Sequence, residues 1–195
     1  MGHSGQIAQN YHIEWSRRHG TSCVGSLPAS GEGGRTTVIG MSNVVQLAPG
    51  RAAPAFTLLD QDGDKVRLAS FKGRRVFVYF YPKADTPGCT QQSCLLRDVE
   101  PQIGDTAIIG ISPDPSAKQR KFADKYQLQF PLLADVDHVV AEKYGVWKQK
   151  SMYGRTYMGI ERSAFLIGTS GKIEQAWYKV SPKDTPVNLL KALGR

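Results

Sequence analysis

The apolar run from Val76 to Tyr81 constrains the fold of this chain more than any other segment. An unbroken run of this length is expected of a strand that is covered on both faces of a sheet. Pro82 disfavours a helical conformation at Tyr81 and therefore ends the strand. The residues from Cys89 to about Gln102 then predict a helix. A buried strand followed by a helix indicates an α/β fold with Cys89 at the junction.

The rest of the chain continues this alternation of strands and helices. The further expected elements are a hairpin of 56–59 and 66–68, strands at 106–112 and 132–133, helices at 116–126 and 139–144, a hairpin of 163–167 and 173–180, and a helix at 184–193. Gly63 marks the turn of the first hairpin and Gly171 that of the second. This order predicts an α/β sheet with mixed strand directions. A chain of 195 residues, 41% of them hydrophobic, can bury one full core.

The first forty residues differ in composition from the rest. They hold three of the four histidines and a Ser/Gly-rich stretch at 26–34, and they show no apolar period. We predict that residues 1–40 are a disordered extension, that Met41 is the natural start, and that residues 41–195 form the domain. Cys23 lies in the extension and is expected to be a bystander, with recruitment as a third redox thiol as the alternative.

The net charge of +8 does not by itself indicate a nucleic-acid partner. Acidic side chains are interleaved with the basic ones, and the densest basic cluster, Lys118 to Lys121, lacks the aromatic or glycine pattern of a nucleic-acid motif. We interpret that cluster as a solvated helix face. The longest apolar runs are too short to cross a bilayer, and the N-terminus has no signal-peptide pattern. We therefore expect no nucleic acid, no membrane association and a cytoplasmic location.

The stretch Thr86-Pro87-Gly88-Cys89-Thr90 carries the chemistry expected of the chain. Only a thiolate is nucleophilic, and the N–H groups at a helix N-terminus stabilise one. The same groups can bind an oxygen atom next to the sulfur. Gly88 permits close approach of the backbone, and the hydroxyl of Thr86 can donate and accept hydrogen bonds. A lone cysteine at a helix start is more often a small buried side chain than a reactive thiol. A second cysteine nearby favours the reactive interpretation.

Cys94 lies five residues after Cys89. In a regular helix, residues at this spacing are roughly 8.7 Å apart between Cα atoms. A disulfide requires Cα atoms within about 7 Å of each other. The two thiols therefore cannot bond while the helix is intact, and a disulfide between them requires its first turns to unwind.

Three other cysteine chemistries fit the chain less well. A metal site needs two further ligands, and His138 is the only histidine beyond residue 40. A Cys–His hydrolase would use the same His138 as its base, although a solvated or capping role is commoner in such a loop or helix start. A thioredoxin-type reductase would have its cysteines separated by two residues rather than four.

The segment from Tyr79 to Thr90 strongly resembles the active-site segment of the peroxiredoxins, and among them that of the bacterioferritin-comigratory protein or peroxiredoxin Q subfamily. The pattern Pro-x-x-x-Thr-x-x-Cys falls on Pro82, Thr86 and Cys89. The likeness extends over about residues 46–194, including 145–147 and 159–167. It implies a thioredoxin fold with an N-terminal β-hairpin and a central mixed sheet flanked by helices.

The resemblance implies a role for each matching residue. Cys89 would be the peroxidatic cysteine, which becomes a sulfenic acid, and Cys94 the resolving cysteine, which forms a disulfide with it. Thr86 would hydrogen-bond the peroxide, Pro82 would shield the sulfur from solvent, and Arg162, in a later strand, would stabilise the thiolate. A thioredoxin-like thiol donor would then reduce the disulfide. No cofactor and no metal are required, and we expect a monomer.

The implied function is thiol-dependent reduction of hydrogen peroxide and organic hydroperoxides. Two alternatives stay open: a peroxide sensor or redox relay that uses the same cysteines, and a non-enzymatic chaperone module with a thioredoxin fold. Without the resemblance, an ion pair with Glu161 at the surface is the simpler interpretation of Arg162. Alternate strand residues face opposite ways, so these two side chains are not expected to enter the pocket together.

Overall fold

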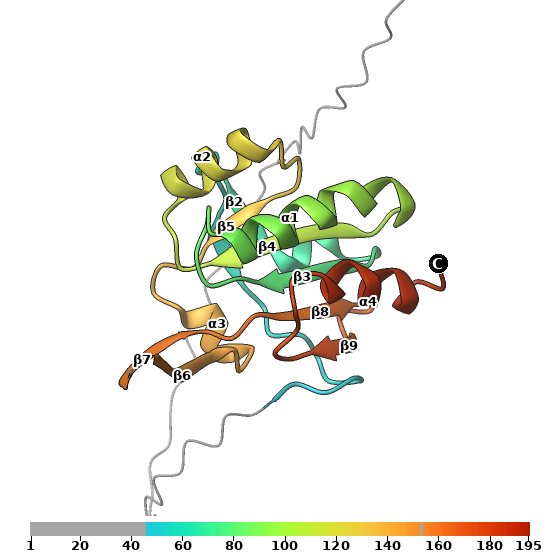
Figure 1. Cartoon of the computed structure of the whole chain (residues 1–195). Helices are drawn as coiled ribbons and strands as arrows, with labels where there is room; N and C mark the ends of the chain where they lie inside the picture. Colours follow the sequence, from blue (N-terminus) through green and yellow to red (C-terminus); the bar gives the residue numbers. More distant parts are fainter. Residues whose placement is uncertain (1–45, 153) are drawn as a thin grey trace, which may run out of the picture. The chain divides into compact units, whose positions relative to one another are not determined.

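The computed structural model of this protein describes residues 46–152 and 154–195, so the predictions for residues 1–40, Met41 and Cys23 lie outside the described residues. Strands and helices alternate before a terminal hairpin and helix (Figure 1). In chain order the elements are β1 (Thr57–Leu59), β2 (Lys65–Arg67), the 3-10 helix η1 (Leu68–Phe71), β3 (Val76–Phe80), α1 (Pro87–Val99), the 3-10 helix η2 (Glu100–Gln102), β4 (Ala107–Ser112), α2 (Ser116–Tyr126), β5 (Leu132–Ala134), α3 (Val139–Lys143), β6 (Trp147–Met152), β7 (Arg155–Ile160), β8 (Ser163–Ile167), β9 (Ile173–Trp177) and α4 (Asp184–Ala192).

Seven of these strands form one mixed sheet in the order β2-β1-β5-β4-β3-β8-β9. β3 pairs with β4 in parallel and with β8 antiparallel, and β4 pairs with β5 in parallel. β1 and β2 form the predicted first hairpin, with Leu58 opposite Val66 and a left-handed glycine, Gly63, in the turn. The prediction of an α/β sheet with mixed strand directions is therefore confirmed.

The central strand β3 is buried along its whole length and separates two hydrophobic cores. Val78 belongs to the core that contains Val140 of α3, whereas Tyr79 belongs to the core that contains Leu96 of α1 and Leu189 of α4. α1 and α4 thus cover the same face of the sheet, where they lie side by side (Figure 1). This packing fixes the start of α1 at the carboxyl end of β3.

Most of the predicted elements are confirmed, and α2 has the predicted bounds. α1 begins at Pro87 rather than Cys89, because proline is well suited to the first position of a helix. The hairpin of β6 and β7 is absent from the predictions. The exposed side chains of β7, from Arg155 to Met158, give that strand no apolar alternation by which it could be recognised.

The basic cluster on α2 is engaged in local ion pairs. Lys118 contacts Asp114, with 2.5 Å between Nζ and Oδ1, and Arg120 contacts Asp62 and Asp124. Gln119, in the middle of the cluster, is buried. Within residues 46–152 and 154–195, no helix is long and apolar enough to cross a bilayer.

Candidate active site

Cys89 is the third residue of α1, and its side chain is only 1% exposed. The preceding residues set this position: Thr86 is the N-cap in an extended conformation, and Pro87 is the first helical residue. The first N–H groups of a helix have no intrahelical partner, and Thr86 makes no side-chain capping bond. The sulfur therefore lies among backbone donors at the positive end of the helix.

The loop that leads from β3 to α1 is tied to α2. Asp85 adopts a left-handed conformation with φ of 60°, and its carboxylate accepts hydrogen bonds from Lys125 Nζ at 2.9 Å and from Tyr126 Oη at 2.7 Å. These hydrogen bonds lower the pKa of Asp85, and the one from Lys125 has the largest effect. The N–H of Ala84 donates to Asp114 Oδ2 at 2.6 Å. The approach to Cys89 is thus held by contacts outside its own helix.

Arg162 is the charged side chain that meets the sulfur. Its Nη2 donates to Cys89 Sγ at 3.4 Å. A Cβ atom added to Gly88 would lie 3.2 Å from that nitrogen, so the glycine makes room for the guanidinium. The predicted strand position of Arg162 is wrong, because the residue lies in the connection between β7 and β8. There its carbonyl accepts a hydrogen bond from the N–H of Val180 at 2.9 Å.

The alternative of an ion pair between Arg162 and Glu161 does not occur. Glu161 instead contacts Lys148, with 2.5 Å between Oε1 and Nζ. Within the described part of the chain, Arg162 has no carboxylate partner among the ion pairs. Its positive charge is consequently directed at the sulfur and not neutralised by an acid.

Gln92 orients Arg162 and was not among the predicted site residues. Its Oε1 accepts a hydrogen bond from Arg162 Nη1, and its Nε2 donates to Thr185 Oγ1 at 3.0 Å. The Thr185 hydroxyl donates in turn to the carbonyl of Ser181 at 2.8 Å. Gln92 and Thr185 are fully buried, so this chain of hydrogen bonds joins α1 to α4 away from water. The spacing of three residues from Cys89, which places Gln92 on the same helix face, was the signal available in the sequence.

Cys94 lies on the same helix as Cys89, and the two thiols are not bonded to each other. Both thiols are free, Cys89 buried and Cys94 partly buried. α1 is also anchored between them, because Ser93 Oγ lies 2.9 Å from Tyr79 Oη in the buried core. In this intact helix the separation of the two cysteines follows regular geometry and is too long for a disulfide.

The other two residues of the predicted motif precede the helix: Thr86 is the N-cap of α1, and Pro82 lies in the loop between β3 and α1. The Thr86 hydroxyl donates to the carbonyl of Lys83 at 2.9 Å, so its oxygen lone pairs remain able to accept a hydrogen bond. Pro82 lies two residues after the end of β3 and is partly buried. Arg162 and Cys89 are thus in contact, whereas the roles of Thr86 and Pro82 at the sulfur stay predictions.

His138 contacts one residue of α3 and one of β6. Its ring stacks on Trp147 with 4.2 Å between centroids, and its Nδ1 lies 2.9 Å from Glu142 Oε1. It is the N-cap residue of α3, in a left-handed conformation. None of these contacts involves a cysteine, so the geometry gives His138 no role as a base for Cys89.

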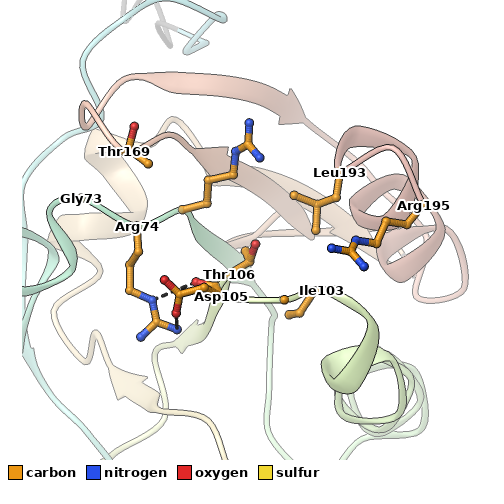
Figure 2. Close-up of a pocket in the computed structure, with 10 residues that line it drawn as sticks. Gly73, Arg74, Ile103, Asp105, Thr106, Thr169, Leu193 and Arg195 are labelled. Atoms are coloured by element: carbon orange, nitrogen blue, oxygen red, sulfur yellow. Dashed lines mark hydrogen bonds and ion pairs between the residues drawn. The ribbon is translucent and has the colours of Figure 1, made fainter.

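A surface pocket of about 250 Å³ lies at the opposite end of the sheet, where β3 and β4 begin. Figure 2 shows Arg74 turned toward Asp105 in this pocket, with 3.0 Å from its Nε to the carbonyl oxygen of Asp105. Arg75, also in the lining, contacts Glu174 at 2.9 Å. No cysteine lines this pocket, so we place the chemistry at Cys89 instead.

Comparison with known proteins agrees with this placement. Residues 49–176 match the model of the AhpC/TSA family. Peroxiredoxin Bcp of Escherichia coli strain K12 is 49% identical over 150 residues, which cover 74% of this chain and 96% of that protein. Peroxiredoxin Bcp of Bacillus subtilis strain 168 is 44% identical over 146 residues, covering 74% and 93%.

Solved structures show the same likeness. The bacterioferritin comigratory protein of Xanthomonas campestris is 33% identical, with a TM-score of 0.68, over 71% of this chain and 90% of that chain. This likeness supports the predicted thioredoxin fold. The chain therefore belongs to the AhpC/TSA family, as a peroxiredoxin of the Bcp and peroxiredoxin Q type.

Proposed function

We propose that this protein reduces hydrogen peroxide and organic hydroperoxides with Cys89 as the peroxidatic thiol. The observation that carries the proposal is the contact of 3.4 Å between Arg162 Nη2 and Cys89 Sγ at the N-terminus of α1. A guanidinium and a helix N-terminus both favour the thiolate over the thiol. The similar bacterioferritin comigratory protein of Xanthomonas campestris has alkyl peroxide reduction activity, which supports organic hydroperoxides as substrates.

In the first step the Cys89 thiolate attacks one oxygen of the peroxide. The S–O bond forms as the O–O bond breaks, and the leaving oxygen departs as water or an alcohol after taking up a proton. We infer that Thr86 accepts a hydrogen bond from the peroxide and that Arg162 stabilises negative charge on both sulfur and oxygen. Pro82 limits access of water to the sulfur. Cys89 is left as a sulfenic acid.

In the second step Cys94 attacks the sulfenic acid and releases water, which yields a disulfide within one chain. This step requires α1 to unwind, because the intact helix holds the two Cα atoms too far apart. Unwinding breaks the hydrogen bonds of Gln92 and Ser93, which lie between the two cysteines. A thioredoxin-like dithiol then reduces the disulfide by exchange. The cycle needs only one chain, so we propose that the protein acts as a monomer. We also propose a cytoplasmic location, because the cytoplasm keeps thiols reduced.

The resolving step is tested with Cys94→Ser in the full chain. We expect this variant to form a sulfenic acid at Cys89 with one equivalent of peroxide and then to stop, because no disulfide reaches the reductant. Intact-protein mass spectrometry measures the first event, and turnover with thioredoxin and its reductase measures the second. Normal recycling of Cys94→Ser would show that another thiol resolves, with Cys23 the first to examine.

The same assay separates the peroxidase from the alternatives. Loss of peroxide consumption in a folded Cys89→Ser variant is expected, and its retention would contradict the proposal. Negligible turnover of the parent protein with thioredoxin, despite normal disulfide formation, would instead indicate a peroxide sensor or relay.

A further inference from the structure

The hairpin of β6 and β7 brings a lysine toward the active site. Lys150, on β6, pairs with Tyr157 on β7. Its amine donates a hydrogen bond to the carbonyl of Ile160, and its stem lies over Gly159, where an added Cβ would be 3.8 Å from Lys150 Cδ. Lys150 therefore reaches across the hairpin to the end of β7.

The carbonyl that Lys150 binds lies two residues before Arg162. The connection from β7 to β8 is held elsewhere by its own backbone: Glu161 N–H donates to the carbonyl of Val146 at 2.8 Å, and the Arg162 carbonyl accepts from Val180 at 2.9 Å. The hydrogen bond from Lys150 adds a side-chain restraint at Ile160. Arg162 leaves this restrained connection to reach Cys89 Sγ.

The surroundings of Lys150 are charged and partly closed to water. Burial lowers the pKa of Lys150, Arg162 acts in the same direction, and Glu161 and Cys89 act against it. Removing water from an ammonium is unfavourable, and the hydrogen bond to the Ile160 carbonyl offsets part of that cost.

We propose that Lys150 is a positioning residue for peroxide reduction, which holds the carbonyl of Ile160 and so fixes the connection from which Arg162 meets Cys89. This inference rests on the proposed roles of Cys89 and Arg162. The residue acts through Arg162 and makes no contact with the reacting atoms.

The test measures the second-order rate constant for oxidation of Cys89 by hydrogen peroxide in a single turnover of the full chain. We expect Lys150→Met to lower this constant about tenfold, because small displacements of a catalytic group have large effects on rate. Lys150→Arg keeps a charged donor and should retain most of the rate. The control is Lys121→Met, which removes an exposed lysine on α2, outside the β6–β7 hairpin. We expect the control to stay within about twofold of the parent.

A double-mutant cycle distinguishes positioning from a general structural effect. In an Arg162→Met background, Lys150→Met should lower the rate constant by less than about twofold, since its effect is transmitted through the arginine. An equal loss in both backgrounds, or no loss in the parent, would overturn the inference. If the proposed function itself were wrong, Cys89→Ser would continue to consume peroxide whatever residue stood at position 150. This result is distinct from equal losses in the two backgrounds.

Discussion

Both ends of the central sheet carry arginines, but these arginines contact different groups. At the end where β3 begins, Arg74 contacts Asp105 in the surface pocket (Figure 2). Arg75 contacts Glu174 at the same end, where both side chains are partly exposed. At the end where β3 leads into α1, Arg162 contacts the amide oxygen of Gln92 and the sulfur of Cys89.

The difference lies in what neutralises the guanidinium. An exposed carboxylate cancels the charge of its arginine and contributes little to stability. A neutral amide orients Arg162 without cancelling its charge, and the burial of Cys89 strengthens electrostatic interactions at the sulfur. The Cys89 end of the sheet is therefore the one whose positive charge is available to an anion.

Arg162→Met should have the largest effect. It removes the charged donor from Cys89, and we expect the rate constant for oxidation by peroxide to fall about a hundredfold, as for loss of one donor to a transition-state anion. Stopped-flow oxidation under single-turnover conditions measures it. Arg75→Met, at the other end of the sheet, is the control and should leave the rate unchanged while costing less than about 1 kcal/mol of stability. Equal rates in the two variants would abolish the contrast between the ends.

Gln92→Leu should have the next largest effect. It leaves a nitrogen of Arg162 and the hydroxyl of Thr185 without their partner in a buried setting, which should lower the free energy of unfolding by about 1–3 kcal/mol. We expect a rate loss of about tenfold, because Arg162 is no longer oriented. Urea unfolding and stopped-flow oxidation measure the two quantities. The neighbouring exposed residue offers the control Gln91→Leu, which should change neither. A stability loss without any rate loss would mean that Gln92 serves packing alone.

Gly88→Ala should have a smaller effect, and only on the rate. The added methyl group would lie 3.2 Å from Arg162 Nη2 and 3.5 Å from Pro182 Cγ, so the guanidinium must shift slightly. We expect oxidation of Cys89 to slow by about threefold. Because alanine favours helix over glycine, the free energy of unfolding should not fall by more than about 1 kcal/mol. An unchanged rate would show that the approach of Arg162 to Gly88 has no catalytic importance.

Much of the fold could be predicted because its strands and helices carry strong local signals. The wholly apolar β3, the Asp-Gly turn before β2 and the proline next to α2 each identify an element from nearby residues alone. The β6 and β7 hairpin has no such signal, since its side chains are mostly polar and β7 is largely exposed. Its pairing depends on where the rest of the fold places it.

The candidate site divides in the same way. Cys89 and Thr86 stand in one short motif at a strand-to-helix junction, which the sequence displays directly. Arg162 required the family resemblance, because 73 residues separate it from the sulfur that it contacts. Thr185 and Lys150 emerge only from the packing of α1 against α4 and from the hairpin beside Arg162. The spacing of Gln92 from Cys89 indicates a shared helix face but not its contact with Arg162. Contacts between distant segments leave no local pattern.

The most direct test of the account is to oxidise the reduced full chain with one equivalent of hydrogen peroxide. Non-reducing peptide mapping then locates the oxidised thiols, and hydrogen exchange follows residues 87–99. The account predicts a disulfide between Cys89 and Cys94 together with faster exchange throughout α1, because the helix must unwind to form it. A disulfide that involves any other pair, or a Cys89–Cys94 disulfide with α1 still fully protected, would contradict it.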